Sequence, residues 1–464
     1  MLNRRNTLLS NSLNSSEPIN IDNYLTIEAL EDGLTAKLST NACEYCIDGN
    51  GVWKTLTANT TTPSINQGQV ISFRGNLTPS NYMGMGTFTI SKKCNLKGNC
   101  MSMLFGDDAE NNYSLSGKNY TFYKMFYNCT NIIEVSPNFL PATTLDNNCY
   151  NSTFYGCTSL TTAPELPATK LARYCYWGMF DSCTSLTTAP ELPATTLANS
   201  CYLGMFNRCT SLTTAPKLPA ITLANNCYYS MFDRCTSLTT APELPSTTLA
   251  DSCYYSMFGG CTSLTTAPEL PSTTLANSCY YGMFSDTNVL PDCSNINFYS
   301  NSVVSSGGLI GLFYGTKVTD DDLKNILPIN PLTGNYYLPA TTLSSNCYNS
   351  MFYGCTSLTT APELPATTLK INCYRNMFYG CTSLTTATEL PATTLANYCY
   401  YYMFYNCKKL NYIKAMFTTI PSSSYTNNWV YGVSSTGTFV KNKDATWNVT
   451  GIHGIPSGWT VQTA

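Results

Sequence analysis

Histidine and charge are scarce in this 464-residue sequence. It contains one histidine, His453, and only 11% of its residues are charged, with a formal net charge of −3 at pH 7. A single imidazole excludes multi-histidine metal sites and most acid–base catalysis that depends on histidine. Because no part of the chain concentrates lysine and arginine, we also expect no binding to nucleic acid, whose phosphates need cations.

Long apolar runs and recognisable catalytic motifs are missing as well. No stretch approaches the ~18 consecutive apolar residues of a membrane span, so membrane insertion is not expected. Residues 6–20 are polar and lack the apolar core of a secretory signal, so no cleavable export signal is predicted. We find no nucleotide-binding loop, nucleophile elbow or distinctive carboxylate pair. The sequence therefore predicts a non-enzymatic protein without a cofactor.

Cysteine, by contrast, is abundant, and its spacing shows why. The chain has 23 cysteines, and they recur every 26 residues from Cys149 to Cys279 and from Cys347 to Cys399. In nearly every unit a second cysteine follows eight residues later, with a Met-Phe pair between the two. Counting degenerate versions, the unit occurs in eleven copies, which indicates a repeat architecture.

One unit has two halves. Leu223, Cys227, Met231 and Cys235 are spaced by four residues, which predicts one apolar face of a helical return. The proline-containing segment that follows predicts a strand of only a few residues. Neither half can bury its apolar side alone, so stacking is required. The expected fold class is a solenoid with a short strand and a helical or turn-like return per ~26-residue unit.

The rest of the chain divides around this array. Alternating residues from Tyr24 to Ile90, with hairpin signals at residues 48–51, predict short strands. Within the array, Thr319 is the expected N-cap of a helix at 320–327, whose first three aspartates are a weaker candidate for Ca²⁺ binding. The expected parts are a flexible arm 1–20, a small β-sandwich-like domain 21–92, a cap or transition 93–120, the solenoid 121–411 interrupted at about 285–340, and a C-terminal cap 412–464.

The cysteines admit three interpretations. Two residues eight apart in a regular helix or strand lie ~12 Å or more from each other, too far for a disulfide within one unit. Buried reduced ladders are the favoured interpretation, and bridges between neighbouring units stay open. A zinc site is a weaker alternative for the four cysteines of the N-terminal region; these are Cys43, Cys46, Cys94 and Cys100. Cys293 falls outside every pattern.

Comparison of the units with one another separates constant from variable positions. The residue after the first cysteine is always tyrosine, as in Tyr150 and Tyr400, which predicts a packing ladder. Nearby positions vary and are rich in aromatic residues and arginine, as in a recognition surface, although plain solvent exposure explains the variation equally well. The candidate recognition residues are Arg173, Tyr174, Trp177, Leu203, Arg208, Tyr229, Arg234, Tyr255, Tyr281, Arg375 and Tyr401.

A second variable column is charged. It precedes each Leu-Pro pair and consists of Glu165, Glu191, Lys217, Glu243, Glu269, Glu363 and Glu389. Like charges stacked at strand spacing repel one another, so these side chains are expected to be solvated. A wet face is the favoured interpretation, with a weakly acidic binding stripe as the alternative.

The repeat core resembles the BspA-like leucine-rich repeat family. The matching pattern is an apolar residue and Phe, then Cys and Leu at fixed spacing, as in Met351 to Leu358, and the likeness covers about 121–411. The tryptophan-rich segment from Trp429 to Trp459 is similar to a C-terminal segment found in such proteins. The resemblance implies a solenoid used in bacterial surface adhesion or in fibre-like proteins of bacteriophages that infect gut bacteria.

The expected function follows from these points. We expect a surface-displayed binding or adhesion protein, with a virion fibre or decoration protein as the leading version because no export signal is seen. The repeats would contact a host surface protein or glycan, and the arm and β-domain would contact virion proteins. A purely structural virion scaffold and a bacterial cell-surface adhesin are the alternatives, and homo-oligomerisation stays open.

Overall fold

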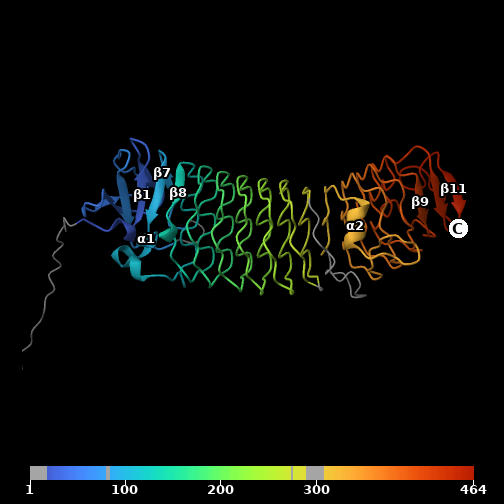
Figure 1. The fold of residues 1–464 in the computed structure, drawn as a ribbon, viewed down its shortest axis with the longest axis horizontal. Helices are drawn as coiled ribbons and strands as arrows, with labels where there is room; N and C mark the ends of the chain where they lie inside the picture. Colours follow the sequence, from blue (N-terminus) through green and yellow to red (C-terminus); the bar gives the residue numbers. More distant parts are fainter. Residues whose placement is uncertain (1–17, 80–83, 273–274, 289–307) are drawn as a thin grey trace, which may run out of the picture.

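The structure is a computed structural model, and it describes residues 18–79, 84–272, 275–288 and 308–464 (Figure 1). Most of the predicted arm, part of the predicted interruption and Cys293 therefore lie outside the described residues. In the view of Figure 1 a β-domain at one end continues into a long stack of coils, which ends in a small sheet at the C-terminus.

The N-terminal domain consists of two sheets. The larger has the strand order β4-β3-β5-β1-β7-β8, and the smaller pairs β2 with β6. The strands are β1 Leu25–Ala29, β2 Ala36–Leu38, β3 Cys43–Ile47, β4 Lys54–Leu56, β5 Val70–Arg74, β6 Phe88–Ile90, β7 Cys94–Gly98 and β8 Ile132–Val135. Phe73 of β5 packs edge-on against Phe88 of β6, with ring centroids 5.1 Å apart. The strands expected between Tyr24 and Ile90 are confirmed, and β3 and β4 are joined through the predicted hairpin.

The larger sheet connects this domain directly to the coils. β7 pairs antiparallel with β1 and parallel with β8, which lies in the first coil. The expected boundary at residue 92 therefore falls inside the sheet, because β7 follows it. Short helices lie next to these strands; they are η1 Ile21–Asn23, α1 Ser102–Phe105, η2 Gly106–Asn111 and η3 Pro137–Phe139. Buried residues from Leu25 to Trp459 form one hydrophobic core.

The return half of each coil is a series of tight turns, so of the two predicted versions the turn-like return is right and the helix is wrong. In one unit the N–H of Met205 donates to the carbonyl of Tyr202 in the same coil (3.2 Å). The N–H of Phe206 donates to Met231 of the next coil (2.9 Å). Local and inter-coil bonds alternate in this way along the return. An α-helix would make neither pattern, because its N–H groups bond four residues back.

Backbone conformation explains the error. Every fourth residue of the return has a positive φ, as at Ser200 (56°), Gly204 (58°) and Arg208 (58°). A left-handed residue ends a right-handed helix, so four-residue segments follow one another as separate turns. Residues four apart still share a face, and Cys227, Met231 and Cys235 are buried as predicted. The apolar period of four residues therefore comes from a series of four-residue turns and not from a helix.

The proline-containing half pairs less extensively than expected. Parallel contacts between neighbouring coils are single bridges, as in the row Thr188, Thr214, Thr240 and Thr266. Proline lacks an N–H and interrupts the ladder on each side, so in the described coils after β8 the pairing is limited to single bridges up to the C-terminal sheet. The described coils thus stack mainly through the hydrogen bonds of their turns.

Aromatic ladders fill the core. The tyrosines that follow the first cysteine are at most 2% exposed, which confirms the predicted packing ladder. Tyr176 and Tyr202 stack with centroids 5.7 Å apart, and Phe180 and Phe206 form a parallel ladder at 5.6 Å. Offset stacked rings bury large apolar areas in every coil.

The helix predicted within the interruption is confirmed as α2 Asp320–Ile326. Thr319 and Asp322 form a capping box, and Lys324 pairs with Asp321 at 3.1 Å. Asp320 accepts hydrogen bonds from the backbone N–H groups of Thr359 (3.0 Å) and Thr360 (3.1 Å). The aspartates therefore start the helix and attach it to a coil.

The C-terminal segment continues the coils before it closes them. The N–H of Phe404 donates to the carbonyl of Trp429 at 2.8 Å, the bond that earlier coils make to methionine. A parallel sheet of β9 Tyr412–Ala415, β10 Thr438–Lys441 and β11 Thr460–Thr463 follows. Trp429 is fully buried against the rings of the last coil, and its indole N–H donates to Gly454 (2.9 Å).

Candidate interaction surface

The turn half of the coils presents the variable residues on the outside of the solenoid. Trp177 is 43% exposed, and Arg173, Arg208 and Arg234 are exposed as well. The other candidates are half-buried; they are Tyr174, Leu203, Tyr229, Tyr255, Tyr281, Arg375 and Tyr401. None of the eleven candidate residues belongs to the core.

The structure brings several of these residues together. The guanidinium of Arg173 lies 4.7 Å from the ring centroid of Tyr174, which in turn contacts Trp177 at 5.3 Å. Arg375 lies 4.9 Å from the ring of Tyr401. These are cation–π contacts at the surface, of the residue types that dominate binding energy in interfaces.

Three candidates form a stacked row in the middle coils, the middle ladder of Tyr229, Tyr255 and Tyr281. Successive ring centroids are 4.3 and 4.2 Å apart, and the rings are within 9° of parallel. Each ring covers the face of its neighbour, so the row presents ring edges and hydroxyl groups to solvent.

Sequence reasoning missed a longer row in the C-terminal coils. We define the C-terminal ladder as Tyr314, Tyr353, Tyr379, Tyr405 and Tyr431, whose successive centroids lie 4.5, 4.5, 4.6 and 4.7 Å apart. All five tyrosines follow the phenylalanine position of the coil. Tyrosine recurs there in the sequence, but the same position holds Asp181, Asn207 and Gly259 in middle coils, and this variation concealed the signal.

More tyrosines extend the C-terminal ladder sideways. Tyr402 packs perpendicular to Tyr405 at 5.3 Å and to Tyr401 at 4.3 Å. Tyr401 also contacts Tyr398, with centroids 5.7 Å apart. Hydrogen bonding with Tyr401 and Asn428 lowers the pKa of Tyr402. The last coils therefore carry a two-dimensional aromatic surface.

The charged column lies on a different part of each coil. Its members are exposed, apart from the half-buried Glu363, which accepts hydrogen bonds from Asn330 (2.6 Å) and Asn335 (3.2 Å). Lys217 and Glu243 line a shallow groove whose walls are prolines of two adjacent coils. Glu389 pairs with Lys414 at 2.7 Å. This arrangement agrees with the solvated face that like-charge repulsion predicts.

The cysteines face the core and are chemically inert. All 22 described cysteines are free and buried. In the second column the thiol donates to a phenylalanine carbonyl of the preceding coil, as from Cys209 to Phe180 (3.0 Å) and from Cys235 to Phe206 (3.0 Å). Burial raises the pKa of Cys175 and Cys261 to about 12. A protonated thiol is a poor nucleophile and a poor metal ligand.

The weaker metal alternatives gain no support from the geometry. Across the described ranges, no group of three or more histidine, cysteine or acidic side chains lies close enough together to hold a metal ion. This includes the four N-terminal cysteines considered for zinc. The thiol of Cys46 instead donates to Asn50 at 3.3 Å.

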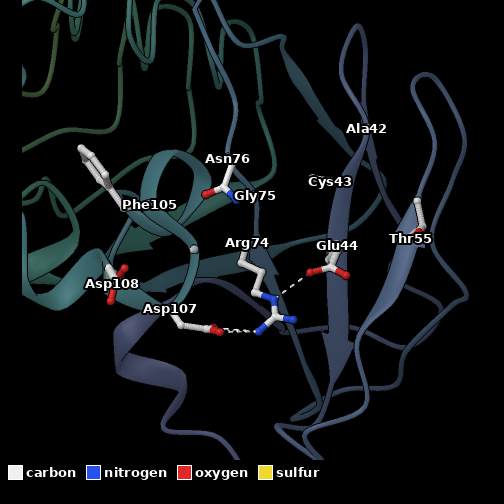
Figure 2. Close-up of a pocket in the computed structure, with 11 residues that line it drawn as sticks. Ala42, Cys43, Glu44, Thr55, Arg74, Gly75, Asn76, Phe105, Asp107 and Asp108 are labelled. Carbon is white, nitrogen blue, oxygen red and sulfur yellow. Dashed lines mark hydrogen bonds and ion pairs between the residues drawn. The ribbon is translucent and has the colours of Figure 1, made fainter. Parts of the chain in front are cut away.

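The N-terminal domain contains a hollow of about 520 Å³ between β3, β5 and the segment after α1. Figure 2 shows Arg74 in it, held between Glu44 (2.8 Å) and Asp107 (2.7 Å). The Arg74 guanidinium also lies 4.2 Å from the ring centroid of Trp53. Burial and a hydrogen bond to Asp107 raise the pKa of Tyr24 to about 12. Because the only cation is already paired with two carboxylates, this arrangement ties the domain together rather than forming an anion site.

Fold and surface together define a repeat solenoid with a variable outer flank on an invariant core, the design of a protein-interaction module. The model of the BspA type leucine-rich repeat region matches residues 123–265 and 341–433 in six copies. These segments amount to just over half of the chain, and the chain belongs to the BspA-type leucine-rich repeat family. Such proteins are typically surface-associated and non-enzymatic. Neither the curated proteins nor the solved structures include a significant match.

Among the helices of the described segments, none combines the length and the apolar character that crossing a bilayer requires.

Proposed function

We propose that this chain is a non-enzymatic adhesion protein that is displayed on a surface and binds its target through the turn flank of the solenoid. The observation that carries the proposal is the contrast between the two sides of the same turns. The inward Tyr and Phe columns hardly change, whereas the outward columns change from coil to coil and collect tyrosine, tryptophan and arginine. Tyrosine provides rigid, amphipathic contact area at a low entropic cost.

The display platform in this proposal is a bacteriophage virion, with the protein as a fibre or decoration protein. The β-domain would attach to virion proteins, and the coils would face a host surface protein or glycan. The continuous core supports such an arrangement, since it runs from the β-domain into the coils, which the pairing of β7 with β8 joins.

The experiment compares binding of the labelled full chain to intact gut-bacterial cells with its binding to purified capsid and tail proteins. Adhesion predicts saturable cell binding that weakens on substitution of the flank, for example by Trp177→Ser with Tyr401→Ser. The matched control is Thr214→Ala, which removes an exposed side chain from the proline-containing half. Attachment to virion proteins without any cell binding would contradict adhesion and favour a structural scaffold.

A further inference from the structure

The two tyrosine ladders lie in segments of the chain that carry opposite net charge. Residues 225–286, which contain the middle ladder, include five acidic side chains and one basic side chain. Residues 370–431, which contain Tyr379, Tyr405 and Tyr431 of the C-terminal ladder, include five basic side chains and one acidic side chain. Two surfaces with the same aromatic geometry are therefore expected to select different partners.

The positive charge near the C-terminal ladder is available for binding. The one acidic side chain of 370–431, Glu389, already pairs with Lys414. Lys370, Arg375, Lys408 and Lys409 form no ion pair with any described residue. Four cations thus remain without a carboxylate partner in the part of the chain that the structure describes.

These cations are close to the aromatic surface. Arg375 contacts the ring of Tyr401. Tyr402 packs against both Tyr401 and Tyr405, so it connects this contact to the ladder. Lys408 and Lys409 are exposed and follow Tyr405 by three and four residues, just beyond the turn closed by the Cys407 N–H and the Phe404 carbonyl (3.1 Å). Arg375 is therefore connected to the ladder through ring contacts, and the two lysines follow Tyr405 closely along the chain.

The ladder itself favours polar contacts along its outer edge. Rings 4.5–4.7 Å apart and nearly parallel leave no room for a ligand ring between them. What they present is a row of ring edges and phenol hydroxyls, and a hydroxyl group can donate a hydrogen bond. Carboxylates are suitable acceptors for such donors, and charge-assisted hydrogen bonds are among the stronger ones.

We propose that the C-terminal ladder, with Arg375, Lys408 and Lys409 at its border, binds an acidic polypeptide. This deepens the proposed adhesion function and rests on it. Carboxylates of the partner would pair with the three cations and accept hydrogen bonds from the tyrosine hydroxyls, while its apolar groups would contact the ring edges. The middle ladder, whose segment 225–286 carries a net negative charge, would repel the same partner.

The test measures binding of the full chain to a labelled random copolymer of glutamate and tyrosine at physiological ionic strength. Three variants are compared with the parent: Lys408→Glu with Lys409→Glu, Tyr379→Ser with Tyr405→Ser, and the matched control Tyr229→Ser with Tyr255→Ser. We expect each C-terminal pair to weaken binding by about tenfold or more and the middle pair to leave it unchanged or slightly strengthened. The lysines are exposed, so reversing their charge leaves the fold intact.

Equal copolymer binding by the parent and the lysine variant would overturn the proposal. Binding to polylysine that is as tight as binding to the copolymer would also overturn it. Tighter binding to heparin through the same residues would overturn it too, because it would identify a sulfated glycan as the ligand. Cell binding without copolymer binding would overturn this inference alone and leave the proposed adhesion function standing.

Discussion

At the scale of single residues, the identity of every fourth residue in the turns decides whether a coil can form. Many of these positions hold glycine, asparagine or serine, and others hold arginine or tyrosine at the same positive φ. A side chain costs roughly 1–2 kcal/mol in the left-handed region, and glycine avoids this cost. The sequence of a coil is therefore constrained by its backbone as much as by its core.

This constraint predicts opposite effects for two substitutions. Gly380→Val places a β-branched residue at φ +73°, where no atom would meet the new Cβ closely, and should lower the free energy of unfolding by about 1–2 kcal/mol. Arg208→Gly, at φ +58°, should raise it by up to ~1 kcal/mol. Urea unfolding measures both. A loss of stability for Arg208→Gly would show that its side chain matters more than its backbone.

The second cysteine column is explained by a hydrogen bond. Its thiol is small enough for the core and adds a second hydrogen bond to a buried carbonyl of the coil before it. At the interruption, Thr316 occupies the equivalent position, but its hydroxyl donates to Phe313 of its own coil at 2.9 Å. Both residues are small donors, and cysteine fills the position with little desolvation.

Cys209→Ala should accordingly destabilise the protein. It removes the donor to Phe180 and leaves a small cavity, for a loss of about 1–3 kcal/mol in urea unfolding. Cys209→Ser, which retains a donor, should lose less than the alanine variant. The reverse order of the two variants would mean that packing volume, not the hydrogen bond, decides the residue at this position.

At the scale of elements, α2 is the one regular helix within the described coils, and its stability depends on its first turn. Thr319 accepts from the Asp322 N–H, and the Asp322 carboxylate accepts from the Thr319 N–H at 2.8 Å. Partial burial alone would raise the pKa of Asp320, but hydrogen bonds from Thr359 and Thr360 lower it. The helix is thus capped and attached by the same three-residue acidic segment.

Thr319→Ala should remove the cap and cost about 1 kcal/mol. The change should appear as faster amide hydrogen exchange within Asp320–Ile326, with the neighbouring coils unchanged. The matched control is Lys324→Ala, which breaks only the exposed ion pair with Asp321 and should change exchange very little. Equal effects of the two variants would contradict the role given to the cap.

At the scale of the whole molecule, a solenoid is held together by contacts between neighbours, so its ends need protection. Trp429 supplies this at the C-terminal end by covering Tyr400 and Phe404, with ring centroids 6.2 Å away in each case. At the other end β7 extends the coil ladder into the β-domain. Damage to one end should therefore spread only gradually along the stack.

Trp429→Ala tests this directly. Loss of a fully buried indole should cost about 3–5 kcal/mol locally. Hydrogen exchange should accelerate in residues 399–417 and stay unchanged in residues 123–160, because nearest-neighbour coupling weakens with distance. Uniform acceleration along the chain would show that the stack unfolds as a single cooperative unit.

The many buried thiols make the whole molecule sensitive to alkali. Burial raises their pKa, to about 12 for Cys175, Cys253 and Cys355. An unfolded thiol has an ordinary pKa of about 8.5. Between these two values the folded chain keeps its thiol protons, whereas the unfolded chain releases them. Stability is complete below about pH 8.5 and falls as pH rises toward 12. The urea midpoint should be constant from about pH 7 to 8 and drop steeply from about pH 9 to 10.5.

Thiol alkylation checks the same point independently. At about pH 8 the 22 described cysteines of the folded chain should resist iodoacetamide, whereas the unfolded, unreduced chain should react at its cysteines. Protection that persists in the unfolded, unreduced chain would reveal disulfides, and an urea midpoint that does not change with pH would contradict the buried thiols.

The sequence by itself determined the repeat, its period, the inward columns and the early strands, because burial imposes a constant residue type wherever the same position faces the same core. It also placed α2, whose capping signal is local. Only the tertiary structure distinguished turns from helix, since residues four apart share a face in both and the deciding hydrogen bonds join residues 25 apart. It alone aligned the C-terminal ladder, because rings separated by 26 to 39 residues become neighbours only when the coils stack.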